Sequence, residues 1–191
     1  AINYLKSPKS FRLGEKVIVI GAGNVAMDAA RTAKHYGAKN VKVIYRKDFE
    51  HMTATKVEIN DAKEEGVKFE LFKSPVEIVD EGVVFIGTKM IEEDGKTKMI
   101  NIEGSEKLIK ADSVIIAVSQ SPKNNIVSNT ENIETNRHGL IVIDDIGHTT
   151  KEGVFACGDV VTGARTVVEA VAHAKKVAQA IDDYCKLKQL N

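Results

Sequence analysis

The sequence predicts an α/β fold in which a parallel sheet comes first and a shorter α/β segment follows. Lys16–Ile20 is a β-branched run of the kind found in strands that are buried on both faces, and a glycine turn follows it. Small apolar residues then recur at helical spacing between residues 24 and 36. A second β-branched run covers residues 41–45. This order predicts a right-handed β-α-β unit, the start of a Rossmann-like domain.

Patterns further along the chain extend the alternation of helices and strands. Residues 53–65 predict a helix, and residues 67–72 and 113–118 predict strands. Between them, short β-prone stretches in residues 75–104 are separated by turn signals, which predicts an antiparallel hairpin layer. After residue 119 we expect strands near 140–143 and 154–157 and a helix over 165–187. The predicted domains are therefore a linker or irregular arm (1–15), a first α/β domain (16–119) and a second unit (120–191).

Composition restricts the classes of partner. Of 191 residues, 27 are Lys or Arg and 27 are Asp or Glu, so the overall charge predicts no nucleic-acid partner. No run approaches the roughly 20 apolar residues of a membrane-spanning helix, and the first residues lack the layout of a signal peptide. The two cysteines form no CxxC pair and no metal-ligand cluster. We expect a cytoplasmic protein with no metal site in this chain and no membrane partner.

The segment Gly21-Ala22-Gly23-Asn24-Val25-Ala26 has glycines at the first two positions of the dinucleotide fingerprint. The first glycine permits a tight turn, and the second lets the backbone approach a pyrophosphate. The helix N-terminus adds free N–H groups and the positive end of its dipole. Gly21, Gly23, Asn24 and Val25 are therefore predicted to bind a nucleotide cofactor.

The end of the second predicted strand indicates which nucleotide binds. An NAD enzyme usually has an acidic residue there to bind the ribose 2′-hydroxyl, but this strand ends in Tyr45-Arg46-Lys47. Two cations suit a 2′-phosphate, because arginine donates two N–H groups to it and lysine adds a point charge. Arg46 and Lys47 therefore predict NADPH.

A second glycine turn lies in the last third of the chain, where a predicted strand ends in Gly158-Asp159 and a long helix follows. Together with GAGNVAMDAARTAKHYGAKNVKVIYRK, this segment resembles the NADPH-dependent glutamate synthase small-subunit family and related flavoproteins. The resemblance implies that residues 120–191 are the C-terminal part of an FAD-binding Rossmann-like domain. It implies that Asp159 binds the ribityl and pyrophosphate region of FAD and that Thr166 lies at the helix N-terminus facing the flavin pyrimidine.

The same resemblance implies an oxidoreductase module that passes hydride from NADPH to FAD, with no catalytic side chain required because the cofactors carry the chemistry. Phe49 and Thr53 stand where the family usually has Arg and Pro, so NADH stays open as an alternative. The first FAD-binding turn and an iron–sulfur region precede this segment in the family. We therefore expect the chain to be a fragment whose partners are that N-terminal FAD and iron–sulfur region and a large glutamate synthase subunit or ferredoxin.

Three alternatives stay open from the sequence. One is a related flavin enzyme of the ferredoxin-NADP or sulfide dehydrogenase type. Another is a flavin-free dehydrogenase, although the chain has no Tyr-x-x-x-Lys or His-rich cluster to move a proton. The third is a nucleotide-binding fragment without activity. Among individual side chains, we expect His173 to be a packed or capping residue and Glu58 to be solvated.

Overall fold

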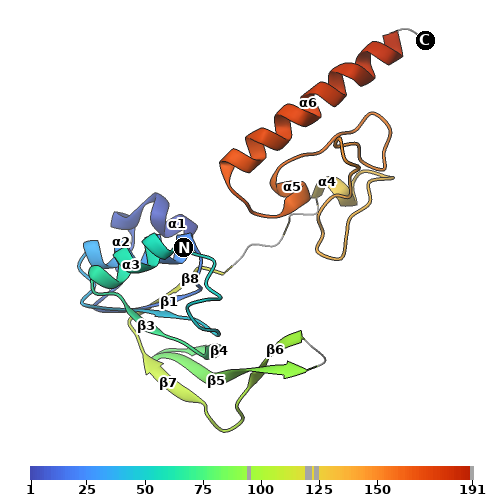
Figure 1. Cartoon of the computed structure of the whole chain (residues 1–191). Helices are drawn as coiled ribbons and strands as arrows, with labels where there is room; N and C mark the ends of the chain where they lie inside the picture. The colour runs from blue at the N-terminus through green and yellow to red at the C-terminus, as the bar shows by residue number, and fades with distance from the viewer. Residues whose placement is uncertain (94–95, 119–121, 123–124, 190–191) are drawn as a thin grey trace. The chain divides into compact units, whose positions relative to one another are not determined.

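The computed structural model describes residues 1–93, 96–118, 122 and 125–189. The chain divides into two compact units, Ala1–Ser119 and Gln120–Asn191, which we call the first and second units (Figure 1). Ser119 and Gln120, where the sequence predicts the domain boundary, lie outside the described residues.

The first unit is built on a four-stranded parallel sheet with the order β3-β2-β1-β8. Its strands are β1 (Lys16–Ile20), β2 (Asn40–Ile44), β3 (Lys68–Glu70) and β8 (Ser113–Ile116). Helices α2 (Asn24–His35) and α3 (Lys56–Glu64) cover one face (Figure 1). Each helix connects two parallel strands, as a crossover must. The predicted α/β class and β-α-β start are confirmed.

The apolar residues of β1 are buried on both faces of the sheet. Val17 and Val19 belong to the core beneath the helices, whereas Ile18 and Ile20 belong to a second core on the opposite face. All four are at most 7% exposed. The parallel sheet is therefore covered on both faces. This explains why the apolar residues of β1 are consecutive and do not alternate with polar ones.

The opposite face is covered by an antiparallel layer, as the sequence predicts (Figure 1). Its strands are β4 (Lys73–Val79), β5 (Gly82–Glu93), β6 (Lys96–Asn101) and β7 (Lys107–Lys110). The long strand β5 pairs with each of the other three. Val83, Phe85 and Ile109 of this layer pack against Ile18 and Ile44 of the parallel sheet.

The first residues differ from the irregular arm that the sequence predicts. Ile2–Lys6 form a short helix, α1, and Pro8–Ser10 form a 3₁₀ turn. Tyr4 is only 3% exposed and joins the core of the first unit. Burial of this aromatic side chain supplies the free energy that holds a five-residue helix, which would not form alone in water.

The second unit contains α4 (Asn125–Ser128), α5 (Asp159–Thr162) and α6 (Val167–Gln189). The strands expected at 140–143 and 154–157 are not present. Those segments form only the isolated bridges Thr135–Ile141, Ile143–Thr149 and His148–Phe155. Between them the Asp144 carboxylate accepts the N–H groups of Ile146 and His148, so the backbone follows a turn where a strand would continue.

The predicted long C-terminal helix is confirmed as α6. Val177 and Ala180 on this helix are buried, while Val167, Val168 and Ile181 are exposed. No helix in the described part of the chain is long and apolar enough to cross a membrane.

Candidate functional site

Gly21 makes the tight turn at the carboxyl end of β1. Its φ is +139°, and a Cβ atom added there would lie 2.3 Å from the carbonyl oxygen of Ala117, which follows β8. Its N–H donates to Ile44 O at 3.2 Å. The turn is therefore wedged between the ends of β2 and β8, and only glycine fits.

The N-terminus of α2 begins directly after this turn. Gly23 is its N-cap, and no side chain caps the helix. Within the described residues, the N–H groups of Asn24 and Val25 have no acceptor, and both residues are exposed. These open donors and the helix dipole make a site that suits an anion such as a pyrophosphate.

The Asn24 side chain has a structural contact. Its Oδ1 accepts the N–H of Thr55 at 2.9 Å, and Ala54 N–H donates to Ala22 O at 2.9 Å. Thr55 is the N-cap of α3, so the glycine turn and the start of α3 are held together. Only Oδ1 of the side chain is engaged, so Asn24 can offer a nucleotide both its backbone N–H and its Nδ2 donors.

Arg46 and Lys47 follow β2 and lie beside the same edge of the sheet. Neither side chain forms an ion pair with any described residue. Their backbone is held by Thr88 of the antiparallel layer and by Phe72, which directly precedes that layer: Thr88 Oγ1 donates to Arg46 O at 2.7 Å, and Phe72 N–H donates to Lys47 O at 3.4 Å. Arg46 and Lys47 therefore have no carboxylate partner among the described residues, and hydrogen bonds fix the backbone of the turn that carries them.

Thr88 is a residue that sequence reasoning missed. It is only 3% exposed, although its side chain is polar. It lies on β5, 42 residues after Arg46, so local pattern gives no indication of their contact. The one available signal is a hydroxyl residue within the apolar run of β5.

The loop after Lys47 is also ordered by its own contacts. His51 Nδ1 lies 2.6 Å from Asp48 Oδ1, and Tyr45 Oη donates to His51 O at 2.9 Å. The hydrogen bond with His51 lowers the pKa of Asp48. The Phe49 ring contacts the Phe69 ring at a tilt of 53°, and Lys63 Nζ lies 3.8 Å from the centroid of the Phe49 ring. The ammonium group of Lys63 therefore lies over the Phe49 ring, close to the turn that carries Arg46 and Lys47.

In the second unit, Gly158 and Asp159 begin the short helix α5. Gly158 has a φ of +71°, and its N–H donates to His173 Nδ1 at 3.3 Å. His173 is therefore a capping residue, as predicted. Asp159 is exposed, and its Oδ1 accepts the N–H of Arg165 at 3.3 Å.

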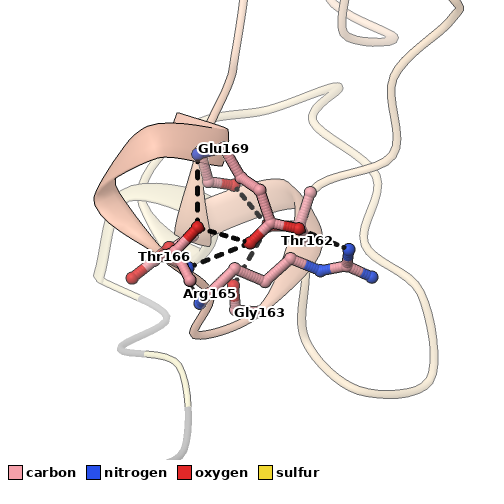
Figure 2. A network of polar contacts seen from close by, with 7 residues as sticks. Thr162, Gly163, Arg165, Thr166 and Glu169 are labelled. Atoms are coloured by element: carbon pink, nitrogen blue, oxygen red, sulfur yellow. Dashed lines mark hydrogen bonds and ion pairs between the residues drawn. The ribbon is translucent and has the colours of Figure 1, made fainter. Parts of the chain in front are cut away.

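Thr166 lies directly before α6 and takes part in a capping box with Glu169 (Figure 2). Its N–H and hydroxyl donate to Glu169 Oε2 at 3.1 and 2.8 Å, and Glu169 N–H donates back to Thr166 Oγ1 at 3.3 Å. Arg165 Nη1 lies 3.2 Å from the other Glu169 oxygen. The hydrogen bond from the Thr166 hydroxyl lowers the Glu169 pKa. The cation before α6 is thus neutralised by a carboxylate of the chain itself.

Other chemically active side chains have structural surroundings. Glu58, expected to be solvated, forms an ion pair at 3.1 Å with Arg31, which also contacts Asp61 and Glu65. Both cysteines are free. Within the described residues, no three His, Cys, Asp or Glu side chains gather as metal ligands would.

A family model described as pyridine nucleotide-disulphide oxidoreductase matches residues 1–174. The chain belongs to this family. The NADP(+)-dependent formate dehydrogenase subunit beta of Moorella thermoacetica is 38% identical over 181 residues, covering 91% of this chain and 25% of that protein. The NADPH glutamate synthase small chain of Escherichia coli is 34% identical over 186 residues, covering 91% of this chain and 39% of that protein. The predicted resemblance to glutamate synthase small subunits is confirmed.

Solved structures agree with the fold. The crystal structure of T. acidophilum thioredoxin reductase matches with a TM-score of 0.73 at 25% identity, over 95% of this chain and 56% of that chain. Mycobacterium tuberculosis FprA in complex with NADPH matches with a TM-score of 0.73 at 13% identity, over 92% of this chain and 54% of that chain. The chain spans about a quarter to two fifths of the length of the curated relatives named above.

Proposed function

We propose that the first unit binds NADPH and that the second unit contributes part of an FAD site in a longer oxidoreductase. The observation that carries the proposal is the glycine turn with open N–H groups on α2, next to Arg46 and Lys47, which form no ion pair with the residues that the structure describes. Membership in a pyridine nucleotide oxidoreductase family supports it. In this proposal, hydride passes from NADPH to FAD and the electrons leave through centres outside these residues.

Each proposed contact has a distinct task. The backbone at Gly21, Gly23, Asn24 and Val25 would bind the pyrophosphate, because the tight turn at Gly21 leads directly into the uncapped N-terminus of α2. Arg46 would grip the 2′-phosphate through two N–H groups, with Lys47 adding charge. These contacts orient the nicotinamide, while a bound flavin supplies the hydride acceptor.

The flavin contacts are proposed for Gly158, Asp159 and Thr166. Asp159 is exposed and its carboxylate accepts one described hydrogen bond, so the carboxylate has further acceptor capacity for ribityl hydroxyls. The Thr166 N–H already donates to Glu169. A flavin carbonyl would therefore have to compete with the Glu169 carboxylate or use the N–H groups that follow it in α6.

An absorption spectrum tests the shared flavin site. We expect the 191-residue chain to purify colourless and to bind added FAD weakly, since the glycine turn that binds FAD pyrophosphate in the family is not in its sequence. The longer polypeptide that includes an upstream FAD region should be yellow and should bleach on anaerobic addition of NADPH. Asp159→Ala in that polypeptide should lose flavin or slow its reduction. Stoichiometric flavin in the 191 residues alone, or no reduction by NADPH in the longer form, would overturn the proposal.

For the final electron acceptor we propose glutamate synthesis, with a large glutamate synthase subunit as partner. Ferredoxin is the alternative partner. Relatives of this chain also include subunits named for formate dehydrogenase and for NADPH-Fe(3+) oxidoreductase. Co-purification of the longer polypeptide with a glutamine-hydrolysing subunit would support glutamate synthesis, and electron delivery to ferredoxin without it would contradict that choice.

A further inference from the structure

The first unit has a second candidate site, which extends from the amino ends of β1 and β2 to the last residue of β3. A cavity of about 310 Å³ opens there between the parallel sheet and the antiparallel layer. We call this space the lysine cavity. Its lining includes five lysines and one glutamate: Lys16, Lys42, Lys73, Lys107, Lys110 and Glu70. The nucleotide turn at Gly21 lies at the carboxyl end of β1, whereas Lys16 of the cavity lies at its amino end, roughly 16 Å away for five residues of strand.

Strand alternation explains why lysines face this space. Ile18, Ile44 and Ile109 belong to the core between the two sheets. Two residues before each of them, and therefore on the same face, stand Lys16, Lys42 and Lys107. The space between the sheets thus changes along the strands from an apolar core to a cavity lined with cations.

The charges of the lysine cavity are unbalanced. Lys42 Nζ lies 2.6 Å from one Glu70 oxygen, and Lys73 contacts the other. Burial by itself raises the Glu70 pKa, but the hydrogen bonds from Lys42 and Lys73 outweigh burial and hold the pKa below its usual value. Glu70 is therefore ionised, and each of its two carboxylate oxygens already contacts a lysine. Lys16, Lys107 and Lys110 form no ion pair with any described residue. Lys110 directly follows Ile109 and therefore alternates to the opposite face of β7, so the other four lysines less one glutamate leave three positive charges.

The wall of the cavity also holds a polar group without a partner. Asn40 lines the space, and its Oδ1 is buried with no hydrogen-bond partner in the described part of the chain. Rotation about χ2 would present the amide N–H₂ group at that position. A buried polar atom of this kind costs free energy until something binds it.

We propose that the lysine cavity binds a small phosphate-bearing anion, separately from the nucleotide at Gly21. The volume lies at the lower end of the range of small-ligand sites, about 300 to 1,000 Å³. Phosphate oxygens accept several hydrogen bonds at once, which matches a cage of lysine donors. Lys16 and Lys107 supply the charge that no described carboxylate pairs, and Lys42 and Lys73 are held in place by Glu70.

Titration of the ¹⁵N-labelled chain with sodium tripolyphosphate tests the proposal. We expect saturable shifts of the amide signals of residues 16–18 and 107–110. The double variant Lys16→Gln/Lys107→Gln should bind at least about tenfold more weakly. Neither of these lysines has a described ion pair, so the variant should keep the wild-type amide spectrum elsewhere. Lys9→Gln/Lys89→Gln removes two exposed lysines outside the cavity and should change the affinity by less than about twofold.

Several outcomes would overturn the proposal. The first is the absence of any saturable shift, and the second is a set of shifts confined to Gly21–Val25. The third is an equal loss of affinity in the two double variants, because equal losses would indicate only general attraction of the anion to a basic surface. Citrate provides the chemical control, since it carries similar charge on carboxylates. Equal affinity for citrate and tripolyphosphate would refute the preference for phosphate.

Discussion

Replacing Thr88 with Val tests whether the antiparallel layer holds the turn that carries Arg46. Valine keeps the β-branched shape but removes the hydroxyl that donates to Arg46 O at 2.7 Å. Because Thr88 is 3% exposed, water cannot easily replace the lost donor. Leaving that carbonyl unpaired should cost about 1 to 3 kcal/mol of stability in the first unit. If Arg46 binds the 2′-phosphate, NADPH affinity should also fall severalfold, with a smaller change for NADH.

Native-state hydrogen exchange of the β5 amides measures the stability change within the first unit, whatever the second unit does. Calorimetry with both nucleotides measures the binding change. Thr88→Ser retains the donor and should restore the preference for NADPH, even though the lost methyl group lowers stability. Wild-type β5 protection together with a wild-type nucleotide preference in Thr88→Val would refute the anchoring role of Thr88.

Three further predictions follow from single contacts. Gly21→Ala should destabilise the first unit by at least about 2 kcal/mol in the same exchange experiment, because alanine disfavours this positive φ and its methyl would meet Ala117 O; wild-type protection would contradict this. Asp112→Asn should lower stability at neutral pH, because the N–H bonds that Asp112 accepts from Lys16 and Glu15 lower its pKa. A lowered folded-state pKa means that this contribution is lost as pH falls below 3.8, so the two denaturation curves should converge in acid. Thr166→Ala should cost α6 about 1 kcal/mol through loss of its cap, seen as faster exchange of its first amides, and unchanged exchange would refute the capping role.

The first unit could be predicted well because its signals are local. Its first strand, the glycine turn and α2 follow from β-branched runs, small residues at helical spacing and glycine, and the structure has them within one or two residues of the predicted bounds. The second unit was less predictable. Residues 140–143 have strand composition, but side-chain hydrogen bonds of Asp144 turn the backbone directly after them.

The candidate site was partly predictable for the same reason. Gly21 and Arg46 stand at positions that the order of strand, turn and helix assigns to a nucleotide, so a local pattern indicates them. The role of Thr88 depends on a contact between β5 and the end of β2, and that of Asn24 on a contact with Thr55. Contacts between segments far apart in the chain leave no periodic signal.

Calorimetry of Arg46→Ala tests the central claim, a 2′-phosphate site beside the glycine turn, most directly. The wild-type chain should bind NADPH more tightly than NADH. Arg46→Ala should remove roughly 1.5 to 3 kcal/mol of NADPH binding, about 10- to 150-fold in affinity, and little of NADH binding. Arg12→Ala removes an exposed arginine without a described ion pair and should change neither affinity. Equal losses for the two nucleotides in Arg46→Ala, or no preference for NADPH in the wild type, would contradict the claim.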